Sequence, residues 1–402
     1  MVNRFSISKV DWRLLTVISF FLLSFLGLTV FPEFLAHSRF LIVWILVGLS
    51  FFLYDKRQVY GKYLILMNIF LFVNAIGCLA NRGQSLISFF RGGEFFILAM
   101  INIYFVVLYM RNRIKDFENV LFYLSIIMCV LYIIQYIIYP TPIFRSTEVA
   151  LDMDIAESSD SRIRIIGQAL GTIAYFMGLN KFLCKKEIKS LIQMALGFSS
   201  IIILGFRSQA FALVLFSILL FVRFYKFSLK MWLPIIFAAV VVYYIVIPLS
   251  FVQNSLENMI ERQESGSGSN EARIITMTYY INNFFQNNWE IFLGAGLPGS
   301  SGEYADYIDK LKSYHFIYAD CGLLGLSWVA GIPVVLIIVI YPIKALLMKV
   351  PKPYLYIGLV LAFSLISSIF TREIYRDGNP FIFGGLLALQ EKINKRTTKV
   401  IV

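Results

Sequence analysis

The stretch KSYHFIYADCGLLG, residues 312–325, holds the side chains of this sequence best suited to moving a proton. His315 is one of only two histidines in 402 residues, and Asp320 follows it by five positions. A histidine with an ordinary pKa of about 6.5 takes a proton from a hydroxyl near neutral pH. We therefore predict that His315 is a catalytic base and that Asp320 orients or polarises it. An interfacial anchor is the alternative role for a lone histidine.

A second pair of charged residues, Arg91 and Glu94, opens an apolar run in the segment SFFRGGEFF. Opposite charges three residues apart on a continuous helix predict an ion pair. The two glycines between them also allow the backbone to break or to approach another segment closely. A break would leave Arg91 facing an anionic ligand, and the sequence leaves both interpretations open.

A third candidate, Arg207, lies in ILGFRSQAF, a very short connection between two apolar runs. A turn of this kind holds a guanidinium at a membrane surface. There the guanidinium either binds a lipid phosphate or only caps the end of the apolar run. The second histidine, His37, lies in the short segment FPEFLAHSRF and is expected to be structural.

The composition indicates which elements must position these residues. The chain is 59% hydrophobic and 15% charged, with 38 Phe and 23 Tyr, unlike an ordinary soluble domain. A bilayer core of about 30 Å needs about 20 apolar residues for each helical crossing. We predict an all-α polytopic membrane protein with one transmembrane domain over residues 1–402. Its first apolar run is expected to be a retained helix, although a basic flank precedes it as in a signal peptide.

About twelve transmembrane helices are expected, with boundaries good to a few residues. They lie at roughly 12–31, 40–54, 63–80, 87–110, 118–139, 166–184, 189–206, 208–222, 231–250, 322–343, 354–370 and 380–391. The cysteines lack the paired spacing of a disulfide framework or a zinc site, so they are expected to be packing residues. They are Cys78, Cys129, Cys184 and Cys321.

Lysine and arginine alternate between the connections of these expected helices, which predicts that both termini are cytoplasmic. The connections on the predicted inner side hold 16 lysines and 7 arginines, whereas those on the outer side hold 11 arginines and 2 lysines. Orientation needs only positive charge, but the planar guanidinium grips two phosphate oxygens at once. The outer face is therefore predicted to bind phosphate or pyrophosphate, with lipid headgroup contact as the alternative.

Two outer loops stand apart by their length, at about 140–165 and 251–316. Long loops beside short connections usually carry function. Within the second loop, ARIITMTYYINNFFQNNWEIFLGAG predicts a surface-lying amphipathic helix at roughly 271–288. The acidic runs DMDIAESSD and EYADYID lack the pattern of a calcium loop, so no metal is expected. No phosphate loop or dinucleotide fingerprint is present either.

The chain resembles the O-antigen polymerase and O-antigen ligase family of bacterial membrane glycosyltransferases, in particular the Wzy-type polymerases. Three features carry the resemblance: GFRSQ at an outer turn, AR followed some twenty residues later by FLGAG in the late outer loop, and HFIYADCGLLGL entering a span. The plan of about twelve spans agrees with that of this family over nearly the whole chain. The ligase branch shows more of its pattern around the histidine than this sequence does.

The resemblance implies a membrane-embedded type C glycosyltransferase fold and an inverting, metal-independent transfer without a cofactor. The donor would be a glycan on undecaprenyl pyrophosphate, used at the outer face of the bacterial inner membrane. It implies that Arg207 and Arg273 grip the pyrophosphate and that His315 serves the acceptor hydroxyl. Further outer-face residues are assigned to the same substrate: Arg91 and Arg164 to the pyrophosphate, Tyr314, Tyr318, Glu94 and Arg145 to the glycan, and the lysines before His315 to the lipid phosphate.

The predicted function is a surface-polysaccharide polymerase that joins undecaprenyl-pyrophosphate-linked repeat units in lipopolysaccharide biosynthesis. Its partners would be the lipid-linked donor and acceptor, the bilayer and a chain-length regulator, with no nucleic acid. Two alternatives stay open: a ligase that moves the glycan onto the lipid A-core, and a lipid-glycan flippase or transporter. Transporters show internal repeats and mid-membrane charges, whereas the ionisable residues of this chain cluster at the predicted outer face.

Overall fold

A computed structural model describes residues 33–109, 114–138, 144, 167–204, 207–225, 270–369 and 371–401. Every regular element in these ranges is helical and no strand occurs within them, which confirms the predicted all-α class. The expected spans at 12–31 and 231–250, most of the loop at 140–165 and the first part of the loop at 251–316 lie outside these residues.

Helices occur at the other ten expected span positions, and shorter ones form the late loop. Their bounds are α2 (Glu33–Leu53), α3 (Gly61–Arg82), α4 (Leu86–Arg91), α5 (Gly93–Ala99), α6 (Ile103–Tyr109), α7 (Ile114–Ile137), α9 (Ala169–Lys185), α10 (Ile188–Leu204), α11 (Arg207–Tyr225), α14 (Asn270–Tyr279), α15 (Asn288–Leu293), α16 (Glu303–Ser313), α17 (Gly322–Ala330), α18 (Ile332–Leu347), α19 (Leu355–Ser367) and α20 (Asn379–Ile401).

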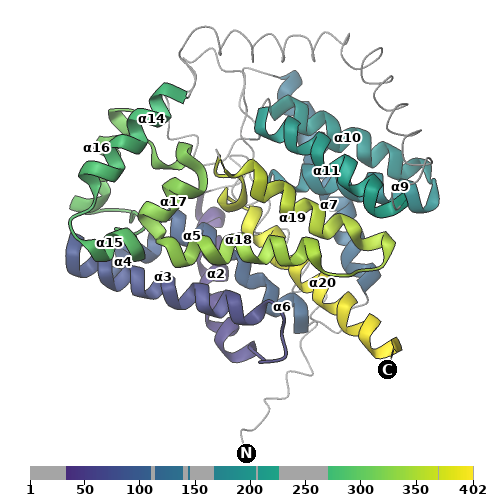
Figure 1. Ribbon diagram of the computed structural model, residues 1–402, viewed down its shortest axis with the longest axis horizontal. Coiled ribbons are helices and arrows are strands. Elements are labelled where there is room, and N and C mark those ends of the chain that lie inside the picture. Colours follow the sequence, from purple (N-terminus) through teal and green to yellow (C-terminus); the bar gives the residue numbers. More distant parts are fainter. Residues whose placement is uncertain are drawn as a thin grey trace, which may run out of the picture.

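The helices form a body with a lobe at one side (Figure 1). Helices α7, α9, α10 and α11 gather on the right of the view, and α18 and α19 run together across the middle. Helices α2, α3 and α6 lie below them, while α14, α15 and α16 form the lobe on the left. The late loop of the sequence therefore folds into a helical unit of its own beside the body.

Two of the expected spans are broken helices. The span expected at 87–110 consists of α4, α5, a 3-10 turn at Met100–Asn102 and α6, and the span expected at 322–343 breaks at Gly331 between α17 and α18. A Cβ at Gly92 would lie 2.3 Å from the Pro298 carbonyl oxygen, and one at Gly331 would lie 2.4 Å from that of Leu293. Both breaks thus make room for the same loop, 293–299, which contains the GAG of the FLGAG motif.

Buried amides hold this loop in place. Asn74 of α3 donates to the Leu293 carbonyl at 2.7 Å and accepts from the Leu297 amide at 3.1 Å. Gln84 donates to the Leu297 carbonyl at 2.9 Å and accepts from the Gly299 amide at 2.7 Å. Each side chain satisfies backbone groups that no helix can pair, which a buried loop requires. The FLGAG motif therefore fixes the lobe against the body.

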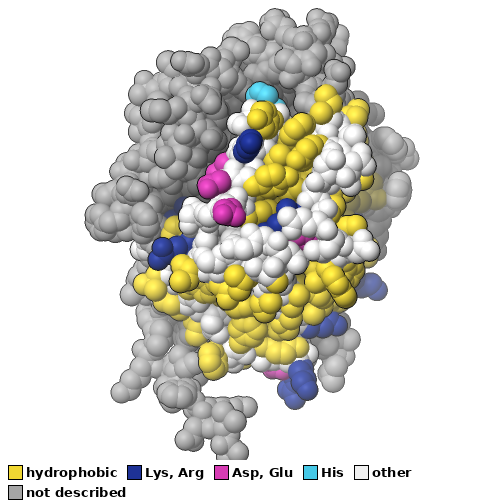
Figure 2. All heavy atoms as spheres, turned by 90° about the vertical axis from the view of Figure 1, so that its left-hand side faces the viewer, with side chains coloured by type: hydrophobic (Ala, Val, Ile, Leu, Met, Phe, Trp, Pro, Cys, Tyr) yellow, Lys and Arg dark blue, Asp and Glu magenta, His cyan; other side chains and the backbone are white. Residues whose placement is uncertain are grey.

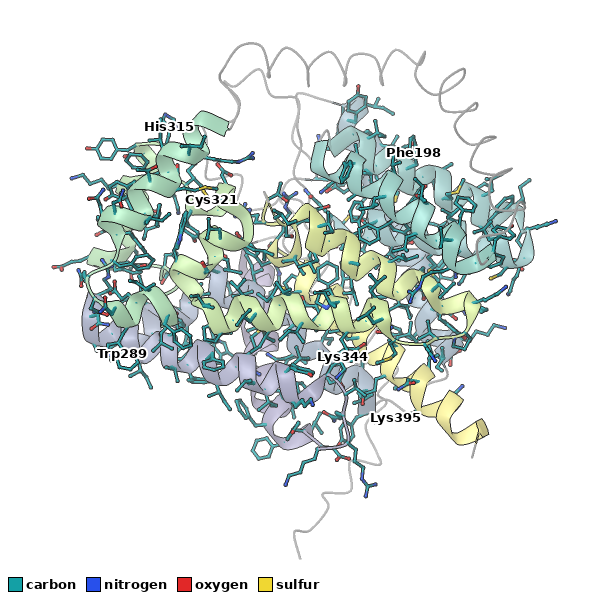
Figure 3. The ribbon with its side chains drawn as sticks, viewed as in Figure 1. Phe198, Trp289, His315, Cys321, Lys344 and Lys395 are labelled. Carbon is teal, nitrogen blue, oxygen red and sulfur yellow. The ribbon has the colours of Figure 1, made fainter. Side chains whose placement is uncertain are left out.

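Contacts between helix ends form one set at the end of the molecule that bears Lys395 (Figure 3). The Val59 amide, in the connection between α2 and α3, donates to Glu391 Oε1 at 3.0 Å. Asn180, near the end of α9, donates to the Pro353 carbonyl between α18 and α19 at 2.7 Å. These connections therefore share one end of the body.

A second set lies at the other end, where His315 is found (Figure 3). Arg39, near the start of α2, pairs with Asp377 before α20 at 2.7 Å. Gln209, near the start of α11, donates to Glu373 at 2.9 Å. Consecutive helices of the body therefore run alternately between the two ends.

Two of the described helices, Gly61–Arg82 and Ile114–Ile137, are long and apolar enough to cross a membrane. The other apolar helices are shorter, partly because breaks divide them, so the expected count of twelve full spans is not reached within the described residues. On the face that carries the lobe, a broad hydrophobic band lies below a region with carboxylates, cations and histidine (Figure 2). An apolar surface of that extent indicates association with a membrane.

Candidate functional site

The lobe presents the candidate site, and its first helix follows the sequence-based prediction in part. The amphipathic helix expected at 271–288 forms as α14, then widens to a π-helical turn at Tyr280–Phe284 and ends before α15. π-helical turns occur frequently at functional sites. The ring of Tyr280 stacks on Trp328 of α17 at 4.6 Å between centroids, which sets this turn against the body.

A buried ion pair fastens the lobe to α3. Arg82 binds Glu290 through two nitrogens, with Nε to Oε1 at 2.8 Å and Nη2 to Oε2 at 2.6 Å, and it also donates to the Phe284 carbonyl at 2.6 Å. Its guanidinium lies 5.2 Å from the ring centroid of Phe284. This arginine, which the sequence assigns to the predicted outer face, is therefore committed to the fold and is not available for phosphate.

Tyrosines of the lobe pack over the segment that carries the predicted base. Tyr279 stacks on Phe316 at 4.6 Å between centroids, and its hydroxyl lies 2.9 Å from that of Tyr307. Burial, followed by the hydrogen bond with Tyr279, raises the pKa of Tyr307 to about 12. Tyr307 is therefore uncharged at neutral pH, and the pair serves as a structural contact.

His315 ends α16 in a conformation that usually belongs to glycine. Its φ is +64°, in the left-handed region. Its amide donates to the Lys312 carbonyl at 2.9 Å, and the Phe316 amide donates to the Leu311 carbonyl at 2.9 Å. These two bonds are those of a Schellman motif, in which the residue at the position of His315 is most often glycine. The imidazole is exposed, on the outer edge of the lobe (Figure 3).

Asp320 does not orient His315 in this structure. Helix α16 ends before the left-handed turn at His315, and residues Tyr318–Cys321 form a separate 3-10 turn, so the two residues do not lie on one helix. No hydrogen bond joins the two side chains, and both are exposed. The backbone carbonyl of Asp320 instead accepts from Arg273 Nε at 3.0 Å. The Arg273 side chain thus contacts the backbone of the predicted segment.

Glu94 and Tyr318, two of the residues assigned to the glycan, meet directly although 224 positions separate them. The Tyr318 hydroxyl donates to Glu94 Oε1 at 3.2 Å. The other oxygen, Oε2, is buried and has no hydrogen-bond partner among the described residues. Burial, and then the Glu94 charge, hold the pKa of Tyr318 well above its ordinary value, so the hydroxyl keeps its proton for this bond.

Arg91 does not pair with Glu94, contrary to the expectation for a continuous helix. Gly92 takes an extended conformation, with ψ of 138°, which turns the two side chains away from helical register. Arg91 is exposed and makes no hydrogen bond or ion pair with the described residues. Arg372 and Lys312 instead lie close enough to act electrostatically on the Glu94 carboxylate. The break in the helix thus separates a cation at the surface from a carboxylate at the site.

The loop between α19 and α20 is the part of the site that the sequence did not single out. Its residues 373–380 are all buried. Glu373 accepts from Asn379 at 3.0 Å and lies 3.5 Å from Arg376, which also donates to Gln168. Burial lowers the pKa of Arg376 from its ordinary value, although Glu373 opposes this. The signal in the sequence is the charge density of TREIYRD between two apolar runs.

The remaining predicted site residues are scattered or lie outside the description. Arg207 begins α11, two residues before Gln209, which bonds to the loop that carries Arg372. Tyr314 is 59% exposed at the end of α16. Arg145 and Arg164 lie outside the described residues, as do the side chains of Arg207 and His37.

The cysteines and carboxylates add no further chemistry within the described part of the chain. All four cysteines are free, and Cys78, Cys129 and Cys321 are buried. The described residues contain no group of three or more histidine, cysteine, aspartate or glutamate side chains that could hold a metal ion.

What the geometry brings together is one carboxylate, one tyrosine and several cations at the place where the late loop returns to the body. A scan against models of protein families finds no match to this chain, and a search of the curated proteins finds none either.

Proposed function

We propose that this chain is a polysaccharide polymerase of the bacterial inner membrane. It joins undecaprenyl-pyrophosphate-linked repeat units at the periplasmic face by inverting, metal-independent glycosyl transfer. The protein crosses the membrane about twelve times with both termini in the cytoplasm, in a type C glycosyltransferase-like arrangement. The resemblance of GFRSQ, FLGAG and HFIYADCGLLGL to the O-antigen polymerase family underlies the proposal.

The arrangement of the helix ends supports the proposed topology. Among the described residues, the connections 54–60 and 348–354, with Lys56, Lys349 and Lys352, lie at the end that bears Lys395, whereas Arg39 and the loop with Arg372 and Arg376 lie at the end that bears His315. Such a division follows the positive-inside rule when the first end is cytoplasmic. The lobe and the pair of Glu94 and Tyr318 would then face the periplasm.

One observation supports the reaction class above the others: the hydrogen bond between Glu94 and Tyr318, with Lys312 and Arg372 beside it. The carboxylate provides an acceptor for a sugar hydroxyl, and the phenol holds the carboxylate in place. Neighbouring cations stabilise a departing diphosphate. Hydroxyl recognition and anion stabilisation are the two requirements of transfer from a glycosyl diphospholipid.

In the proposed step the acceptor hydroxyl attacks the anomeric carbon from the side opposite the diphosphate. The new carbon–oxygen bond forms as the bond to the phosphate oxygen breaks, and the electron pair leaves with the lipid diphosphate. Outer-face cations, among them Arg273 and Arg207, neutralise the leaving group. His315 is our proposal for the base that takes the hydroxyl proton.

The proposal is tested with the full chain reconstituted in lipid nanodiscs. The substrate is the lipid-linked repeat unit extracted from cells that lack this protein. We expect a ladder of lengthening glycans and release of one lipid diphosphate for each bond formed, with and without EDTA. Gel separation of the glycans and mass spectrometry of the lipid measure both.

Other products would overturn the proposal in favour of a stated alternative. Transfer of single units onto an added lipid A-core acceptor, without a ladder, would identify a ligase. Movement of the lipid-linked unit across a vesicle bilayer, without any new glycosidic bond, would identify a flippase. Loss of the ladder in EDTA would contradict the metal-independent mechanism.

A further inference from the structure

We infer that Glu94 is the hydroxyl-recognition residue of the site: its unpartnered carboxylate oxygen accepts a hydrogen bond from one hydroxyl of a substrate sugar ring, with Tyr318 holding the carboxylate in place. The inference rests on the proposed function and adds to it the residue that recognises the sugar. It assigns a binding role to Glu94, distinct from the proton transfer proposed for His315.

The unpartnered oxygen is the first observation behind this inference. Glu94 Oε1 accepts from Tyr318, whereas Oε2 is buried without any hydrogen-bond partner among the described residues. Buried carboxylate oxygens are costly unless a donor pairs with them. The donor that fits must be small and polar, as a sugar hydroxyl is.

The position of Glu94 in the chain is the second observation. The residue follows a helix break at Gly92, where a Cβ would lie 2.3 Å from the Pro298 carbonyl oxygen, so the break is fixed by the loop packed against it. Glu94 itself is only partly buried. Because the last side-chain torsion of glutamate is soft and nearly two-fold, its rotation exchanges the two oxygens between the position bonded to Tyr318 and the unpartnered position. Glu94 is therefore fixed at its backbone, while either of its oxygens is able to occupy the unpartnered position.

The electrostatic surroundings are the third observation. Arg372, from the loop between α19 and α20, and Lys312, from the last turn of α16, both act on Glu94. Lys312 is also paired with Asp309 at 2.8 Å, on the exposed face of α16. Even with these cations acting on the carboxylate, its second oxygen has no hydrogen-bond partner among the described residues, so a neutral donor would satisfy it.

The test compares Glu94→Gln with the wild-type chain in the nanodisc assay, using the same extracted lipid-linked repeat unit. The amide keeps the size of the side chain and still accepts from Tyr318, but it loses the charge that strengthens the hydrogen bond to a hydroxyl. We expect KM for the lipid-linked unit to rise by about 10- to 100-fold, with kcat reduced less than KM is raised. Tyr318→Phe should raise KM by a smaller factor, because the carboxylate remains.

The matched control is Glu303→Gln, which makes the same charge change on the exposed first turn of α16. Its KM and kcat should equal those of the wild-type chain. Unchanged KM in Glu94→Gln would overturn the inference, and so would a fall in kcat at constant KM, which would make Glu94 a proton acceptor instead. Failure of the wild-type chain to form any ladder would instead contradict the proposed function, so the two failures are distinguishable.

Discussion

At the scale of single residues, His315 combines an exposed imidazole with a backbone conformation that glycine adopts more easily. A non-glycine residue in the left-handed region costs roughly 1–2 kcal/mol, and the Schellman motif here needs that conformation. Residues held in such regions cluster at functional sites, so the strain is a reason to test His315.

Two substitutions separate the backbone of His315 from its side chain. His315→Gly should be more stable than His315→Ala by about 1 kcal/mol, because only alanine opposes φ of +64°. Both variants should lose the glycan ladder if the imidazole is the base. Thermal unfolding in detergent and the nanodisc assay measure the two effects. A full-length ladder from His315→Gly would refute the catalytic role, since that variant keeps the turn.

At the scale of elements, the lobe depends on one buried ion pair, and the side chains of Arg82 and Glu290 are only 6% and 2% exposed. Removing one partner from a buried pair typically costs about 3–5 kcal/mol, because the other charge is left without compensation. The contacts of Tyr280 with Trp328 and of Tyr279 with Phe316 lie on the same lobe. The attachment of the lobe to α3 therefore affects the whole site.

Arg82→Ala should lower the free energy of unfolding by about 3–5 kcal/mol and weaken the activity through displacement of the lobe. Arg91→Ala is the control, because Arg91 is also assigned to the predicted outer face but is exposed. It should change the stability by less than about 0.5 kcal/mol. Thermal unfolding and limited proteolysis of the purified variants provide the measurement. Equal stability of the two variants would show that the lobe does not depend on this pair.

At the scale of the whole molecule, the two ends of the body differ in their cations, and the membrane topology follows from which end is cytoplasmic. Ser313, on α16, and Arg57, between α2 and α3, are both exposed, one at each end. Three of the native cysteines are buried and Cys184 is partly so, which keeps their background labelling low.

Ser313→Cys should react with a membrane-impermeant maleimide in intact spheroplasts, whereas Arg57→Cys should react only after the membrane is opened. The physical reason is that the proposed topology puts Ser313 in the periplasm and Arg57 in the cytoplasm. Labelling is followed by mass shift after purification. The opposite pattern, or equal labelling of both variants in intact cells, would refute the proposed orientation.

The sequence by itself determined the all-helical class, the positions of ten helical segments and, in part, the helix that opens the lobe. Hydrophobic runs and helical periodicity are local properties, so they can be read without knowledge of distant contacts. Local reasoning left two interpretations open for Arg91 with Glu94, an ion pair or a break at the glycines, and it predicted from closeness in sequence that Asp320 orients His315. A glycine break separates the first pair, and a left-handed turn interrupts the chain between the second.

Only the tertiary structure decided which residues share the site. Tyr318 meets Glu94 across 224 positions, Arg82 meets Glu290 across 208, and Gln209 meets Glu373 across 164. No periodic pattern encodes such pairs, because they depend on how helices pack against each other. The sequence could rank arginines by their predicted side of the membrane, but packing alone separates Arg82, which holds the fold, from Arg91, which remains exposed at the surface.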